Sequence, residues 1–84
     1  MTVVLHDPNT IRLIGACPAE DGESLLQELL ANPTAQVDWR GCESAHTAVI
    51  QVLLVAERQL LGPPAGAFLR QFISPALARL GSQI

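Results

Sequence analysis

The chain has no lysine and few charged residues of either sign. Its five positive charges are all arginines, scattered at positions 12, 40, 58, 70 and 79, and the net charge is −3. Binding to nucleic-acid phosphates needs a concentrated basic face, which scattered arginines on an acidic chain do not provide. We therefore expect no nucleic acid among the partners of this protein.

Long apolar runs are also missing. The longest strongly apolar run, Ala48 to Ala56, is interrupted by Gln51, and a membrane-spanning helix needs about 20 residues. The first residues, MTVVLHDP, lack the charged segment followed by an apolar segment that is typical of a secretory leader. We expect no membrane insertion and a cytoplasmic location.

Cysteine is scarce, and residues that bind metals are not paired. Cys17 and Cys42 are too few for a disulfide framework, so both are expected to be reduced. Zinc sites use cysteines or histidines in short pairs, whereas His6 and Cys17 stand alone and only Cys42 and His46 lie close in sequence. We expect neither a metal site nor any other cofactor.

No catalytic pattern stands out either. Serine, histidine and aspartate do not fall in an order that suggests a hydrolytic triad. The glycines of residues 62–66, GPPAG, lack the lysine of a phosphate-binding loop. We therefore expect that the protein is not an enzyme.

What the sequence does contain is a high share of apolar residues, which make up 49% of the chain. In 84 residues, this composition predicts one folded domain spanning residues 1–84, with a modest core. It also exceeds what a lone small domain needs, which indicates a surface for a partner or a second copy.

The first half of the chain predicts a hairpin and then a helix. Strands are expected at Thr2 to His6 and at Ile11 to Ala16, joined by the turn residues 7–10, DPNT. A helix follows, with Asp21 or Ser24 as its N-cap and Asn32 in a left-handed conformation at its end. Its leucines form one predicted buried stripe: Leu25, Leu26, Leu29 and Leu30.

A third strand and a second helix are predicted next. The strand covers Ala35 to Trp39, with Val37 and Trp39 on one face, and Gly41 closes it. After a polar loop, Thr47 to Leu61 has helical spacing. This helix is apolar over more than one stripe, and the extra residues either meet a partner or lie under the third helix: Ile50, Leu54 and Val55.

The third helix is predicted at Ala65 to Phe72, with Phe68, Leu69 and Phe72 packing on the sheet. Pro75 is expected to separate it from a last turn or two capped by Ser74, followed by a frayed end at residues 81–84. The order β-β-α-β-α-α predicts an α/β fold. We expect a small mixed sheet of three or four strands, with about three helices packed mainly on one face.

Residues 38–54 carry a more specific pattern, D-W-R-G-C-E-S-A-H-T-A-V-I-Q-V-L-L. It aligns without a gap with D-L-S-G-V-x-x-I-D-S-A-G-L-Q-L-L-L, the signature of the strand–loop–helix junction in STAS domains (sulfate transporter and anti-sigma factor antagonist). Thr47 stands in for the signature serine. The identical residues are Asp38, Gly41, Ala48, Gln51, Leu53 and Leu54. The chain resembles a divergent, shortened STAS domain.

Two departures from the STAS signature bear on function. His46 replaces its second acidic residue, and Val49 replaces its glycine. In phosphorylatable members of the family the acceptor lies two residues after the acidic position, where this chain has Ala48. In members that serve lipid-transport ATPases a functional threonine follows the acid directly, where this chain has Thr47. The family's further strand after the second helix has no room here, because residues 61–64 read LGPP.

The resemblance implies a non-enzymatic protein-interaction or regulatory module of bacterial signalling, of the anti-sigma antagonist or chemotaxis type. Its partner would be a kinase or an anti-sigma-like factor. The alternative is a structural subunit or a homodimeric component of a larger assembly, such as a transporter-associated complex. The expected contact residues are Glu43, Ser44, His46, Thr47, Ile50 and Leu54.

Residues in this junction can also have purely structural roles. Thr47 is a candidate phosphorylation site, but it or Ser44 could simply be the N-cap of the second helix. His46 could tune that site or be an ordinary surface histidine. Asp38 is expected to accept hydrogen bonds from loop N–H groups.

Overall fold

The computed structural model describes the backbone of residues 2–81 and the side chains of residues 2–77. Its four strands form one mixed sheet in the order β1-β2-β3-β4. The hairpin strands β1 (Val3–Asp7) and β2 (Thr10–Cys17) are antiparallel. Strand β3 (Gln36–Ala45) runs parallel to β2, and the two-residue strand β4 (Leu60–Leu61) runs parallel to β3.

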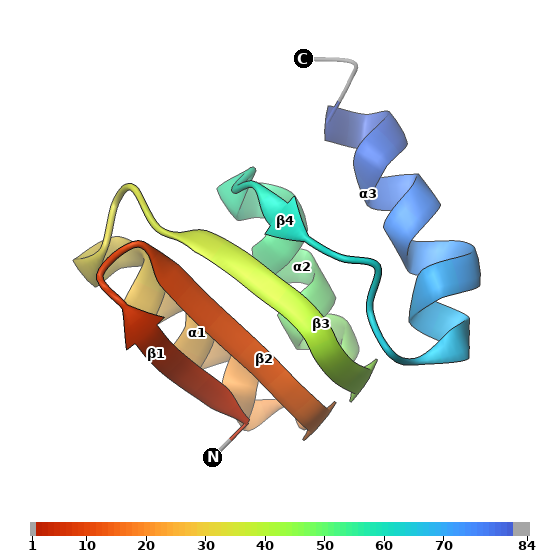
Figure 1. The fold of residues 1–84 in the computed structure, drawn as a ribbon, viewed down its shortest axis with the longest axis horizontal. Coiled ribbons are helices and arrows are strands. Elements are labelled where there is room, and N and C mark those ends of the chain that lie inside the picture. The colour runs from red at the N-terminus through yellow and green to blue at the C-terminus, as the bar shows by residue number, and fades with distance from the viewer. Residues whose placement is uncertain (1, 82–84) are drawn as a thin grey trace.

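The helices lie mainly on one face of the sheet (Figure 1). Helices α1 (Glu20–Ala31) and α2 (Thr47–Ala56) cover that face, and α3 (Ser74–Gly81) lies beyond β4. The predicted α/β fold and its order of elements are therefore confirmed. The predicted fraying concerns residues 82–84, which lie outside the described part of the chain, and Gly81, which is the last residue of α3.

The core lies between the sheet and the α1–α2 layer. The sheet contributes apolar side chains that point to the helices, and each helix contributes the side chains of its inner face. The largest fully buried side chains are Trp39, Ile11, Leu13, Leu25, Leu29, Val37 and Val49. The alternation predicted for the third strand is confirmed for Val37 and Trp39.

The connection between β1 and β2 is the turn that the sequence predicts. Asp7 pairs with Thr10 across the hairpin, and a carboxylate oxygen of Asp7 accepts a hydrogen bond from the N–H of Asn9 at 2.8 Å. Such a bond from an aspartate to the backbone two residues on is a common way to fix a turn.

Helix α1 differs from its prediction at both ends and along its length. Its N-cap is Ala19, without a side-chain bond, and Asn32 at the other end has φ −128° and is not left-handed. Only Leu25 and Leu29 of the predicted stripe are buried, whereas Leu30 is 72% exposed. The reason is that α1 meets the sheet on one side and α2 on another, which leaves its outer side in solvent.

Arg58 holds the end of α1 and the turn that follows it. Its guanidinium donates hydrogen bonds to the carbonyls of Leu29, Asn32 and Ala35 at 2.9, 3.0 and 2.8 Å. Carbonyls at the end of a helix have no partner within the helix, and a cation there also offsets the negative end of the helix dipole. Arg58 therefore joins the end of α2 to the connection between α1 and β3.

The junction between β3 and α2 differs most from its prediction. Strand β3 does not close at Gly41 but continues to Ala45, so most of the predicted polar loop is strand. Helix α2 ends at Ala56 rather than Leu61, because Glu57 adopts a left-handed conformation with φ 54°. The chain then turns back, and Leu60 and Leu61 pair with Val37 and Asp38. The expectation that no strand fits between the second and third helices was therefore wrong.

Pro75 does not divide the last helix as predicted. The chain passes from a π-helical turn, η1 (Leu69–Ile73), directly into α3, and the N–H of Ser74 donates to the carbonyl of Leu69. Ser74 is thus not the cap of a separate helix. In an α-helix the Pro75 ring would clash with the carbonyl four residues earlier. We attribute its tolerance here to the wider turn just before it, which moves that carbonyl away.

No helix within residues 2–81 combines the length and the apolar character needed to cross a membrane.

Candidate functional site

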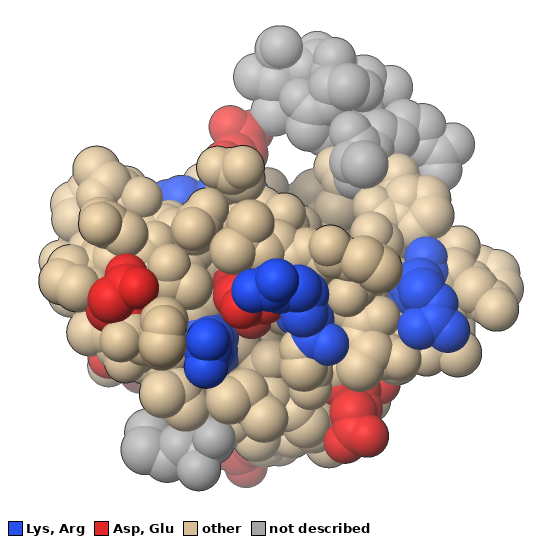
Figure 2. Space-filling view, viewed as in Figure 1, with Lys and Arg blue, Asp and Glu red and all other residues tan. Residues whose placement is uncertain are grey.

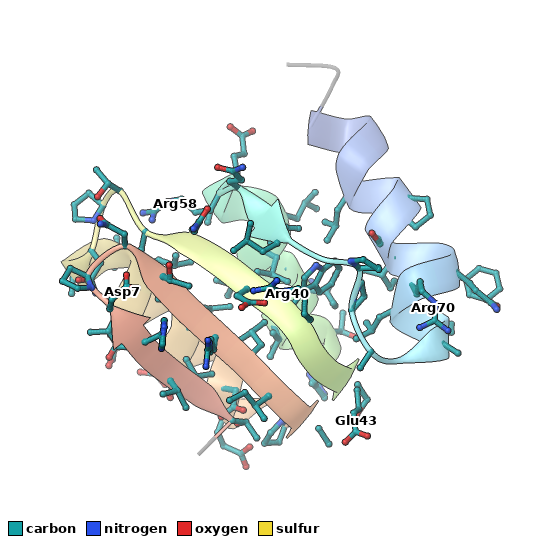
Figure 3. The ribbon with its side chains drawn as sticks, in the orientation of Figure 1. Asp7, Arg40, Glu43, Arg58 and Arg70 are labelled. Atoms are coloured by element: carbon teal, nitrogen blue, oxygen red, sulfur yellow. The ribbon has the colours of Figure 1, made fainter. Side chains whose placement is uncertain are left out.

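The end of β3 and the start of α2 bring most of the predicted contact residues to one edge of the sheet. Glu43, Ser44, His46 and Thr47 are all exposed. Figure 3 shows Glu43 at the carboxyl end of β3. The N–H of His46 donates to the carbonyl of Cys17 at 2.9 Å, which ties the junction to the end of β2. The site is therefore a short exposed segment on a fixed backbone.

His46, and neither Thr47 nor Ser44, is the N-cap of α2. Its Nδ1 accepts a hydrogen bond from the N–H of Ala48 at 3.0 Å, in the extended conformation usual for this position. Accepting at Nδ1 requires the neutral ring with its proton on Nε2. The imidazole thus supplies the acceptor at a position where the aligned STAS signature has an acidic residue.

Thr47 is the first residue of α2, and its side chain is exposed. Within the described residues, no hydrogen bond uses its hydroxyl group. Because His46 satisfies an N–H of the first turn, Thr47 is not needed as a cap. The hydroxyl lies at the positive end of the helix dipole, where a negative group would be stabilised.

Ala48 has a packing role at the contact between α2 and α1. It is half-buried where α2 approaches α1, and a Cβ added to Gly22 would lie 3.1 Å from the Ala48 Cβ. The two helices therefore meet through two of the smallest side chains. A larger residue at position 48 would press on the backbone of α1.

The outer face of α2 extends the site away from the junction. Thr47, Ile50 and Leu54 are spaced three and four residues apart, so they lie along one face of the helix. Ile50 is half-buried and packs on the core, whereas Leu54 is 41% exposed and Val55 79%. The alternative that the third helix covers Leu54 and Val55 is therefore wrong.

The segment after β4 also reaches the junction, which the sequence did not predict. The N–H of Gly66 donates to the carbonyl of Cys42 at 3.0 Å, and a Cβ at Gly66 would overlap the carbonyl oxygen of Glu43. This contact places the start of the last helical segment beside the end of β3. Only glycine fits there.

Two phenylalanines predicted to pack on the sheet are exposed instead. Phe68 and Phe72 are 65% and 61% exposed, and their ring centroids lie 5.2 Å apart. Leu69, between them in sequence, is buried and takes the place expected for the aromatic rings. The four-residue spacing puts both rings on one side of the helix, but it does not say which side faces the core.

Asp38 lies on the opposite, open face of the sheet at the centre of a small charged cluster. Figure 2 shows acidic and basic side chains meeting in the middle of this face, and Figure 3 places Arg40 there. Arg40 donates to the two carboxylate oxygens at 3.0 and 2.9 Å, and Arg12 lies 3.8 Å away. The expected backbone bond comes from the N–H of Arg40, within the strand rather than a loop, at 3.1 Å.

This cluster fixes the charge of Asp38. The hydrogen bond from the Arg40 side chain, aided by the Arg40 N–H and the charge of Arg12, holds the pKa of the Asp38 carboxyl below its usual value despite its burial. The cluster therefore holds a buried carboxylate, and we assign it a structural role in the sheet.

The two cysteines lie together in the core as free thiols. The sulfur atoms of Cys17 and Cys42 are 3.9 Å apart. Burial raises the pKa of both thiols, that of Cys42 to about 12. Thiols react as thiolates, so neither cysteine is suited to act as a nucleophile. Among the described residues, no group of three histidine, cysteine or acidic side chains could hold a metal ion.

Comparisons of the chain with protein-family models, with curated proteins and with solved structures found no match. The resemblance to STAS domains therefore depends on residues 38–54 and on the order of the elements.

Proposed function

We propose that the protein is a non-enzymatic, STAS-like interaction module that binds a regulatory protein through the end of β3 and the outer face of α2. One observation carries this proposal. The segment from Glu43 to Thr47 is exposed on a hydrogen-bonded backbone, and His46 rather than Thr47 caps the helix. The exposed polar side chains of this segment are thus available to a partner.

A signalling partner is the first choice, as a kinase or an anti-sigma-like factor in the cytoplasm. Thr47 supports it, because its hydroxyl is accessible at a helix N-terminus, where backbone N–H groups favour a phosphate. Ala48 cannot be phosphorylated, so a switch on this chain would use Thr47. The module would then bind its partner in one phosphorylation state and release it in the other.

The second candidate is a subunit of a larger assembly, such as a transporter-associated complex. The exposed apolar side chains favour it, because exposed apolar surface of this kind is typical of sites that are covered in a complex. They come from α1, α2 and the last helical segment: Leu30, Leu54, Val55, Phe68 and Phe72.

Binding measurements with purified partners test both candidates. The partners to test are any kinase or anti-sigma-like protein, and any transport ATPase, that neighbouring genes encode. Calorimetric titrations compare the wild type with Thr47→Ala and Thr47→Glu, and Thr34→Glu serves as a control at an exposed threonine far from the site. We expect Thr47→Glu to weaken binding at least about tenfold, which corresponds to about 1.4 kcal/mol.

The pattern of results separates the proposals. Thr34→Glu should bind like the wild type, and Thr47→Ala should have a smaller effect than Thr47→Glu. Unchanged affinity for both Thr47 variants would show that Thr47 is not part of the contact surface. If neither class of partner binds the wild-type chain, the proposed function is wrong.

A further inference from the structure

Strand β1 is a free edge of the sheet. Figure 1 shows it at the margin, with no other described element beyond it. The strand reads VVLHD, and its first three residues carry no charge and no proline. Proteins usually protect an edge strand with charges, prolines, bulges or a covering element, because unpaired backbone groups invite another strand.

The hydrogen-bond pattern identifies which backbone groups of β1 are unpaired. The N–H of Ile14 donates to the carbonyl of Thr2, so Thr2 and Ile14 are a hydrogen-bonded pair. In an antiparallel ladder such pairs alternate with non-bonded ones, so Val4 bonds to Arg12 and the pairs of Val3 and Leu5 do not bond. The N–H and C=O groups of Val3 and Leu5 therefore point outward from the sheet.

The opposite edge of the sheet is protected in ways that β1 is not. Strand β4 has only two residues and is followed by Gly62, Pro63 and Pro64. The prolines cannot donate a backbone hydrogen bond, and the last helical segment lies beyond β4 (Figure 1). Of the two edges of the sheet, β1 is therefore the one to which a further strand can be added.

A second copy of β1 fits this edge by symmetry. When two β1 strands run antiparallel about a two-fold axis at Val4, the outward groups of Val3 face those of Leu5 in the partner. The N–H of Val3 in one copy then faces the C=O of Leu5 in the other, and the N–H of that Leu5 faces the C=O of Val3. The two-fold axis repeats these two bonds on its other side, as an isologous contact requires. This register also places the two Val4 side chains opposite each other on the open face.

Side-chain packing agrees with this register. Leu5 is 45% exposed, although it lies on the same side of the strand as the buried Val3. In the pair, Val3 of the second copy lies opposite Leu5 and covers it. The charged end of the strand, His6 and Asp7, lies outside this stretch, beyond a register shift that interrupts the β1–β2 ladder.

We propose that the protein forms a homodimer in which two β1 strands pair antiparallel about Val4 and join the two sheets into one. This inference concerns a different edge from the proposed binding site and does not depend on it. The dimer would leave Glu43 to Thr47 open in both copies. A single strand pair buries little surface, so we expect a concentration-dependent equilibrium rather than a permanent dimer.

Sedimentation of the full chain with a matched pair of proline variants tests the dimer. Leu5→Pro removes an outward N–H and leaves the β1–β2 bonds intact, which an edge strand tolerates. Val4→Pro removes an N–H that bonds to β2 and should instead lower the free energy of unfolding. We expect the wild type to dimerise below about 1 mM, and Leu5→Pro to raise the dissociation constant at least about tenfold.

A cysteine at the axis tests the register separately. Opposite residues of a non-bonded antiparallel pair have Cα atoms about 4.5 Å apart, which is within the range of a disulfide. Val4→Cys should therefore form a disulfide-linked dimer with oxidised glutathione, whereas Ser44→Cys, exposed at the far junction, should not. Peptide mapping should locate the link at position 4, since the native thiols are buried.

Three outcomes would overturn the proposal. The first is a wild-type chain that stays monomeric up to about 1 mM. The second is a dimer that Leu5→Pro does not weaken while the variant remains folded. If Leu5→Pro does not fold, Leu5→Lys replaces it, because it keeps all backbone bonds and adds a charge at the interface. The third is the absence of a disulfide between the two copies of position 4 in a folded Val4→Cys variant.

Discussion

The role of His46 determines which role is left for its neighbour Thr47. As the N-cap of α2, it leaves the Thr47 hydroxyl unused within the described residues. Serine, threonine, aspartate and asparagine are the usual N-caps, so the residue types at positions 44–47 favour Thr47 or Ser44 over His46. The imidazole Nδ1 nevertheless offers the same kind of acceptor at a similar distance from the backbone.

Replacing His46 tests this assignment. His46→Ala should lower the free energy of unfolding by about 1 kcal/mol, because an N–H of the first turn loses its acceptor. His46→Asn should retain most of the stability, since asparagine is a good N-cap. Urea denaturation of both variants measures the difference. A larger loss from Thr47→Val than from His46→Ala would show that Thr47 is the cap.

Asp38 predicts how the stability of the fold depends on pH. Its pKa is lowered in the folded state by Arg40, so the unfolded chain takes up this proton at a higher pH. Its contribution is present above the unfolded pKa of about 3.9 and is lost as the pH falls through the lower folded pKa. Asp38→Asn should cost about 1–3 kcal/mol at pH 7.

The same variant should flatten the acid limb of the stability curve, measured by denaturation at a series of pH values. Arg40→Gln should shift the curve in the same direction, because it removes the largest cause of the lowered pKa. An acid limb that stays as steep in Asp38→Asn as in the wild type would mean that other carboxylates dominate.

At the scale of elements, the contact of Gly66 with β3 docks the last helical segment on the sheet. Gly66→Ala should lower the free energy of unfolding by about 1–3 kcal/mol, because the new methyl group overlaps the Glu43 carbonyl. Gly41→Ala, on β3 itself, is the matched control. A Cβ there meets nothing closer than 3.7 Å, so we expect little change. Equal effects in thermal denaturation would contradict the docking role.

The elements themselves were predictable where periodicity and turn residues agreed. The hairpin, the crossover helix α1 and the start of α2 at Thr47 all follow from residue patterns. The end of α2 did not, because Leu60 and Leu61 continue the apolar spacing of the helix but lie in a strand. The left-handed Glu57 that separates them has no sequence signal of its own, since glycine and asparagine are the usual residues there.

The site was predictable only in part. Glu43, Ser44, His46 and Thr47 were expected to be exposed, and they are. The strand that carries the first of them was expected to be a loop, because Arg40 and Gly41 resemble a strand end. The exposed rings of Phe68 and Phe72 could not be predicted, because helical spacing gives a stripe without saying which neighbour covers it.

The molecule as a whole keeps its two thiols away from solvent. Cys17 and Cys42 are buried under the helix layer, and their pKa values are raised. At about pH 8 a disulfide reagent such as DTNB should therefore react slowly with the folded protein and rapidly after unfolding. The slow rate would report opening of the core, because the reagent reaches the thiols only when the structure opens.

Ser44→Cys gives the control for that rate. Its thiol lies on the surface at the end of β3 and should react at once, while the two native thiols remain slow. Rapid reaction of all thiols in the native state would show that the core is open to solvent.

The π-helical turn also sets the rotational phase of the C-terminal helix. Leu69, Ile73 and Leu77 follow each other at intervals of four residues, a spacing that drifts around a regular α-helix. The wider turn between Leu69 and Ile73 offsets that drift, so all three side chains meet the same core. Deleting one residue from 70–72 would restore an ordinary helix with Leu69 and Leu77 seven residues apart, a spacing that keeps both on one face, so Leu77 should stay on the core. The π-helical turn therefore accommodates one extra residue without changing which face of the helix meets the core.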